Sequence, residues 1–193
     1  KESETSSLNL ENVKRSLELI NELNEIRKSE GLPEFKVIDE LFAVSTWNAD
    51  IVANSGVFDH VAQFPDAQVY FGECVGYDHG PDERSIYVGM YYQKKERYEN
   101  WEAFKNDYNS QYPNNKPLTD SYSDKFKFCG HYMLLSDPDY KSVGISKNST
   151  YGETVIDLNP ELINMNDEKI QKTYSVAEWT ERFNTYYNKM HGD

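Results

Sequence analysis

The spacing of apolar residues changes along this chain, and this change constrains the fold more than any other feature. Over residues 10–26 apolar side chains recur every three or four positions, which predicts a helix that ends at Gly31 and Pro33. Over residues 126–135 two sets of side chains alternate, which predicts a strand. Helices that precede a group of strands indicate the α+β class.

Further helices and strands extend this pattern. The remaining expected elements are helices over residues 39–55 and 83–104, strands over residues 141–146 and 154–158, and a C-terminal helix opened by a capping box from Ser175 to Glu178. Gly56 is expected to end the helix over residues 39–55. A polar loop over residues 106–125 is expected before the strands, which are predicted to form an antiparallel meander.

Two of these helices carry stripes that are expected to face inward. In the helix over residues 39–55 the stripe consists of Leu41, Val44, Trp47, Asn48 and Ile51. In the helix over residues 83–104 it consists of Tyr87, Tyr91, Lys94, Tyr98 and Trp101. We therefore expect Lys94 to face the part of the fold that this helix packs against.

The length of the chain suits one main domain. It has 193 residues, of which 38% are hydrophobic, and this is enough for one sizeable core. We expect a polar N-terminal segment over residues 1–9, the main domain over residues 10–160, and a polar linker with a C-terminal helix over residues 161–193.

The charge balance narrows the range of partners. Asp and Glu number 33 against 20 Lys and Arg, so the net charge is −13. A negative surface repels phosphate backbones and anionic lipid headgroups, which argues against nucleic acid and such membranes as partners. No apolar run approaches the roughly 20 residues of a membrane span, so we expect no span in this segment.

The two cysteines, Cys74 and Cys129, lie beside the residues with the most chemical potential. Their spacing is not that of a zinc site, which needs paired cysteines. Two interpretations stay open at this stage. They form one disulfide of an extracellular protein, or they are two buried thiols that pack as small hydrophobic residues.

Four residues have the makings of a site. His60 and His131 offer a metal-ligand nitrogen or a general base, and Glu73 offers an acid, a base or an orienting acceptor. Lys94 projects from the helix that is expected to cover them. A single histidine is more often a hydrogen-bonded core residue than a ligand, so the candidate site depends on the set and not on one member.

At this point the chain resembles the CAP superfamily, which comprises cysteine-rich secretory proteins, antigen 5 and pathogenesis-related 1 and is also called the SCP domain family. The resemblance covers roughly residues 13–158. The matching segments, in chain order, are Asn21–Arg27 with Gly31-Leu32, the Trp47/Ala49 helix leading to His60, Gly72-Glu73-Cys74, and Gly130-His131-Tyr132 with Val143-Gly144. The family fold is a three-layer α-β-α sandwich with a small antiparallel sheet, which agrees with the elements predicted above.

The resemblance implies a cavity of two histidines and two glutamates, in which the histidines hold a divalent ion such as zinc. His60, Glu73 and His131 match three of these positions, with His60 and His131 as the implied metal ligands. The register set by Tyr98 places Lys94 where the family has its second glutamate. Two interpretations of Lys94 stay open: an ion pair with Glu73 that disfavours a metal, or a lysine stem lying across Tyr91 and Tyr98 with its head in solvent.

The resemblance also implies a function class. The acidity and low cysteine content resemble a CAP domain of a Gram-positive bacterial surface or secreted protein, extracellular, with a role such as adhesion or virulence. The expected function is recognition of a protein, cell-wall glycan or lipid through the altered cavity. The alternative is a hydrolase, such as a peptidase, that uses His60 or His131 as base and Glu73 as acid, base or orienter, with Lys94 or a metal near the oxyanion.

Overall fold

The computed structural model describes residues 3–60, 72–159 and 172–191, and the chain divides into two compact units. The first, here called the sheet unit, comprises Lys1–His79 and Pro138–Asp193. The second, here called the helical unit, comprises Gly80–Asp137. Each is described by itself. Phe71, which directly precedes Gly72-Glu73-Cys74, and residues 161–171 of the expected polar linker lie outside the described residues.

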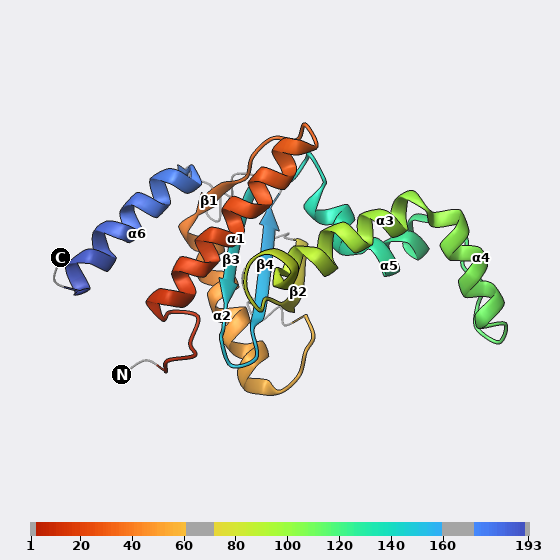
Figure 1. Cartoon of the computed structure of the whole chain (residues 1–193), viewed down its shortest axis with the longest axis horizontal. Coiled ribbons are helices and arrows are strands. Elements are labelled where there is room, and N and C mark those ends of the chain that lie inside the picture. The colour runs from red at the N-terminus through yellow and green to blue at the C-terminus, as the bar shows by residue number, and fades with distance from the viewer. Residues whose placement is uncertain (1–2, 61–71, 160–171, 192–193) are drawn as a thin grey trace, which may run out of the picture. The chain divides into compact units, whose positions relative to one another are not determined.

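The sheet unit is an α-β-α sandwich, which confirms the predicted α+β class (Figure 1). Its elements are α1 (Leu10–Ser29), β1 (Lys36–Ile38), α2 (Asp39–Ser55), β2 (Gly72–Tyr77), β3 (Ser142–Lys147), β4 (Glu153–Asn159), β5 (Thr173–Tyr174) and α6 (Val176–His191). Both α1 and α2 pack against β3, and α2 also packs against β4. None of the described helices is long and apolar enough to cross a membrane.

The five strands form a mixed sheet in the order β2-β4-β3-β1-β5. The pairs β2–β4, β3–β4 and β1–β5 are antiparallel, whereas β1 and β3 are parallel. The prediction of strands near β3 and β4 is confirmed, but the expected all-antiparallel meander is wrong. The edge strand β2 and the short strands β1 and β5 were not predicted from the alternation of side chains.

One face of the sheet is shaped for close contact with α2. Val75 and Val155 form a buried cluster with Ala49 and Val52 of that helix. On β3, Gly144 lies so close to α2 that a Cβ atom there would come 2.2 Å from the backbone oxygen of Leu41. A glycine therefore allows the helix backbone to touch the sheet backbone, which no other residue permits.

The ends of α2 and α6 follow their local sequence signals. Gly56 adopts the left-handed conformation (φ 67°) that ends α2, as predicted. The capping box at α6 is confirmed, because the Ser175 backbone N–H donates to Glu178 over 2.7 Å and the Glu178 N–H donates to Ser175 Oγ over 3.2 Å. The inward stripe of α2 is confirmed at Leu41, Val44 and Asn48, but Trp47 is 56% exposed.

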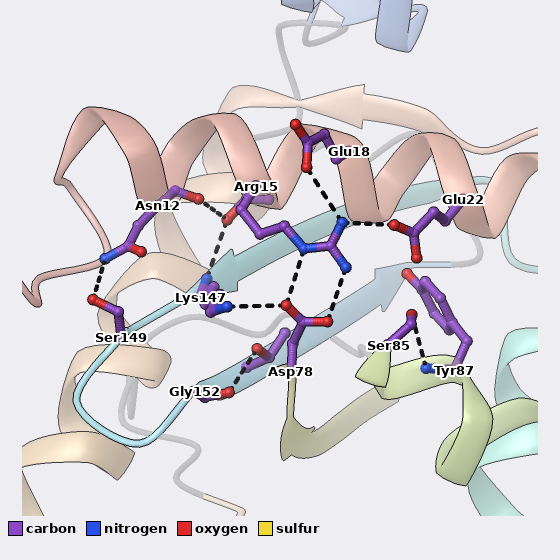
Figure 2. Close-up of polar contacts among 12 residues, drawn as sticks. Asn12, Arg15, Glu18, Glu22, Asp78, Ser85, Tyr87, Lys147, Ser149 and Gly152 are labelled. Atoms are coloured by element: carbon purple, nitrogen blue, oxygen red, sulfur yellow. Dashed lines mark hydrogen bonds and ion pairs between the residues drawn. The ribbon is translucent and has the colours of Figure 1, made fainter. Parts of the chain in front are cut away.

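A buried ion network ties α1 to the strands of the sheet unit (Figure 2). The Asp78 carboxylate is fully buried and accepts hydrogen bonds from Arg15 Nε (3.0 Å), Arg15 Nη2 (2.9 Å) and Lys147 Nζ (3.0 Å). Arg15 also contacts Glu22 (2.6 Å) and Glu18 (3.3 Å). Burial alone would raise the pKa of Asp78, but the hydrogen bonds and charges of Arg15 and Lys147 outweigh it and lower that pKa.

The helical unit corrects two predictions. The helix expected over residues 83–104 is divided into η1 (Asp82–Arg84), η2 (Val88–Tyr92), α3 (Gln93–Glu99) and α4 (Trp101–Gln111). The chain turns between α3 and α4 at Asn100, where φ is −103° and ψ is 31°. The polar loop expected over residues 106–125 is shorter, because α4 continues to Gln111 and α5 begins at Tyr122.

The strand expected over residues 126–135 is instead the helix α5 (Tyr122–Leu135). Ser121 caps this helix by accepting a hydrogen bond from the Asp124 N–H over 3.2 Å. Apolar residues occupy both alternating sets in this segment, so it has no single apolar strand face, and a short apolar run does not by itself distinguish strand from helix. Phe128 packs instead against the α4 aromatic rings of Phe104 and Tyr108.

Candidate functional site

The sheet unit brings two of the four predicted site residues together. His60 Nδ1 lies 2.8 Å from Glu73 Oε1, and the second carboxylate oxygen of Glu73 accepts a hydrogen bond from Asn48 Nδ2 over 2.9 Å. The Glu73 side chain is only 7% exposed, whereas that of His60 is 57% exposed. A buried carboxylate therefore holds a solvent-facing imidazole, which is an arrangement suited to proton transfer.

The local fold explains this pairing. Glu73 lies on β2 with the same alternation as Val75, so its side chain faces α2, where Asn48 is fully buried. The left-handed Gly56 ends α2 and redirects the chain, and His60 follows four residues later. The contacts of Glu73 with Asn48 and His60 thus bring together a residue of α2, a residue of β2 and a residue of the segment that follows α2.

Asp157 is a second acidic residue of this site, and it was not predicted from the sequence. It lies on β4 directly opposite Glu73 and is fully buried. Burial, followed by the charge of Glu73, raises the pKa of Asp157 well above its usual value. A signal was present in the sequence, because one carboxylate interrupts the otherwise apolar run from Val155 to Leu158.

The other two predicted site residues, Lys94 and His131, belong to the helical unit. Lys94 lies on α3, where burial, followed by the positive charge of Arg97, lowers the pKa of its amine. His131 lies on α5, and the ring of its neighbour Tyr132 contacts those of Tyr91 and Tyr98 at centroid distances of 5.3 and 5.4 Å. The predicted tetrad is therefore divided between the two units, and the Lys94–Glu73 ion pair stays a hypothesis.

The residues that the structure describes contain no group of three or more His, Cys, Asp or Glu side chains arranged to hold a metal ion. The two implied metal ligands, His60 and His131, belong to different units. The metal-binding expectation drawn from the family resemblance thus stays untested by this geometry.

Both cysteines are free and buried, Cys74 in the sheet unit and Cys129 in the helical unit. Burial raises the pKa of the Cys74 thiol, and the carboxyl groups of Asp157 and Glu73 act in the same direction. Burial also raises the pKa of Cys129, against the opposing charges of Arg97, Lys94 and Lys125. Neutral, buried thiols of this kind are unreactive and serve packing.

A second feature of the sheet unit is an apolar groove between α2 and α6, here called the α2–α6 groove. Its volume is about 910 Å³, and its lining side chains include Trp47, Ile51, Trp179, Phe183, Tyr186 and Met190. Trp47, Tyr186 and Met190 are each more than half exposed. Ligand sites are commonly this large and this apolar.

The charged groups that line the groove are both acidic, and both have partners inside the sheet unit. Asp39 accepts from Trp179 Nε1 over 2.7 Å and pairs with Arg182 over 3.2 Å. Asp50 accepts from the Ser7 N–H and from Asn148 Nδ2, each over 2.8 Å. The ring of Trp179 lies 4.7 Å from that of Phe42, so the contacts of Trp179 and Arg182 hold α6 beside α2.

The groove was not predicted from the sequence, because the helical spacing of Trp47 placed this residue in the core.

Comparison with known proteins adds no assignment: no protein-family model matches the chain, and no curated protein matches it significantly. The residues themselves therefore carry the functional argument.

Proposed function

We propose that this chain is a CAP-type recognition module of an extracellular, Gram-positive bacterial surface or secreted protein. The observation that carries the recognition function is the α2–α6 groove, whose aromatic and aliphatic walls reach solvent. The α-β-α sandwich and the adjacency of His60 and Glu73 support the CAP-type assignment. This conclusion moves recognition from the His/Glu cavity to the apolar groove.

The occupant that the groove favours is a helical segment of a partner protein with an apolar face and basic flanks. An apolar groove beside a helix of 16 residues, about 24 Å long, suits the apolar stripe of another helix. Both charged lining residues, Asp39 and Asp50, are acidic, and the chain carries a net charge of −13. A basic segment is therefore attracted, whereas an acidic one is repelled.

Two synthetic amphipathic helices test this proposal. Both have the same leucine face, but one carries lysine on its polar face and the other carries glutamate. We expect the leucine/lysine peptide to bind more tightly, and Trp47→Ala to weaken it by about tenfold or more because an aromatic anchor is lost. Isothermal titration gives the affinities, and the fluorescence of Trp47 and Trp179 reports occupancy of the groove.

Tyr151→Ala is the matched control, because Tyr151 is 71% exposed and does not line the groove. Equal affinity of wild type and Trp47→Ala for the leucine/lysine peptide would exclude the groove as the binding site. Tighter binding of the glutamate peptide would contradict the charge argument. If sedimentation shows that the chain self-associates and that Trp47→Ala abolishes this, the occupant is a second copy of the chain. If the chain binds neutral lipid vesicles instead of the peptides, the occupant is a lipid.

A second candidate function is hydrolysis by general acid–base catalysis at His60. The observation that favours it is the 2.8 Å contact between the exposed imidazole and the buried Glu73 carboxylate. With Nδ1–H donating to Glu73, Nε2 is left to accept a proton from water, and the carboxylate stabilises the imidazolium that forms. Peptides are the substrate class that the CAP resemblance implies.

Turnover of a peptide library tests the hydrolase. We expect His60→Ala to lower the rate by about 10²–10⁴-fold, which is the usual contribution of a general base. Thermal stability should change little, because the His60 side chain is 57% exposed. His79→Ala serves as the control, since His79 is also an exposed histidine of the sheet unit. Unchanged turnover in His60→Ala would exclude this histidine as the base.

A further inference from the structure

Two carboxyl groups, those of Glu73 and Asp157, belong to the site of His60, although proton transfer through His60 needs only one. Glu73 and Asp157 are directly opposite on the antiparallel strands β2 and β4, so their side chains project from the same face of the sheet. Opposite residues in such a pair have Cβ atoms about 4.5–5.5 Å apart. Asp157 is fully buried and the Glu73 side chain is 7% exposed, so water screens neither charge well.

The hydrogen-bond donors around the pair are divided unequally. Glu73 accepts from Asn48 on one oxygen and lies against His60 on the other. Neither oxygen of Asp157 accepts a hydrogen bond from any donor within the described residues. On the neighbouring strand β3, the residue paired with Asp157 is Gly144, which has no side chain that could donate a hydrogen bond. An ionised Asp157 would therefore be a buried charge beside a like charge with nothing to stabilise it.

We propose that Asp157 carries a proton, donates it in a hydrogen bond to Glu73, and so positions Glu73 as the single anion that orients His60. Glu73 then receives hydrogen bonds from α2, β4 and the His60 ring, which restricts its rotation. The raised pKa of Asp157 agrees with this assignment. Asp157 is a positioning residue and does not meet a substrate. The inference rests on the second function proposed above, but its test measures no turnover.

Infrared spectroscopy tests the wild-type chain directly. At pH 7 we expect a C=O stretching band of a neutral carboxylic acid, and incorporation of carbon-13-labelled aspartate should shift it. Glutamate labelling should leave it in place, which separates Asp157 from Glu73. The Asp157→Asn variant should lose the band. Because asparagine is neutral, nearly isosteric and can donate to Glu73, this variant should also keep the fold.

A wild-type spectrum without the neutral-acid band, or a band that persists in Asp157→Asn, would overturn the proposal.

Discussion

Replacing Gly144 by alanine is expected to cost about 3 kcal/mol or more of the free energy of unfolding. The added Cβ atom would lie 2.2 Å from the Leu41 backbone oxygen and 2.7 Å from the Phe42 backbone nitrogen. Because these are backbone atoms at the start of α2, no change of side-chain rotamer relieves the overlap. The helix has to move away from the sheet, and the packing of α2 on β3 is lost with it.

Urea denaturation followed by circular dichroism measures this loss, and Gly89→Ala is its control. A Cβ atom added at Gly89 would have no atom within 4 Å other than its own helix backbone and chain neighbours. Alanine there should leave stability unchanged or raise it by up to about 1 kcal/mol, since glycine is the more flexible residue in the unfolded chain. If Gly144→Ala were as mild as Gly89→Ala, α2 would not lie against β3 as described.

The second large effect is expected for Asp78→Ala, which should destabilise the chain by about 3–5 kcal/mol. This substitution leaves Arg15 and Lys147 without their shared carboxylate while their side chains are only 12% and 14% exposed. Lys147 loses the carboxylate that its ammonium contacts and Arg15 loses two of its hydrogen bonds, and the donors left behind need water that the fold excludes. Glu18→Ala is the matched control, because Glu18 contacts the same arginine but is 52% exposed, and about 0.5 kcal/mol or less is expected.

The Asp78 network also predicts a pH dependence. Its folded-state pKa is lowered relative to the unfolded chain, so its contribution to stability is fully present above the unfolded pKa of about 4 and is lost as pH falls through the lower folded pKa. Denaturation at a series of acidic pH values should show a smaller decline in Asp78→Ala than in wild type. An equal decline in both would mean that other carboxylates carry the acid sensitivity.

Local sequence signals predicted several elements well. The helix over residues 39–55 was predicted with its observed ends, because Gly56 supplies the left-handed residue that stops it. Strands β3 and β4 and the capping box at Ser175 were also predicted, since β-branched residues and caps act within a few positions. These features depend on neighbours along the chain and are therefore visible in the sequence.

The failures occurred where long-range contacts choose between local alternatives. The segment that became α5 is apolar on both alternating faces, and its packing against α4 selects a helix. Lys36–Ile38 is too short to identify as a strand alone and becomes β1 by pairing with β3. Trp47 follows the helical period of a core residue but lines the groove, since α6 packs beside it without covering it.

The sequence by itself determined the α+β class, the ends of α2, and the identity of His60 and Glu73 as candidate site residues. Only the tertiary structure decided that Asn48 and Asp157 join them, that Lys94 and His131 belong to a separate compact unit, and that an apolar groove lies between α2 and α6. The physical reason is strand register and helix packing. Both are set by contacts between segments far apart in the chain, and these contacts decide which carboxylates meet and which aromatic rings stay exposed.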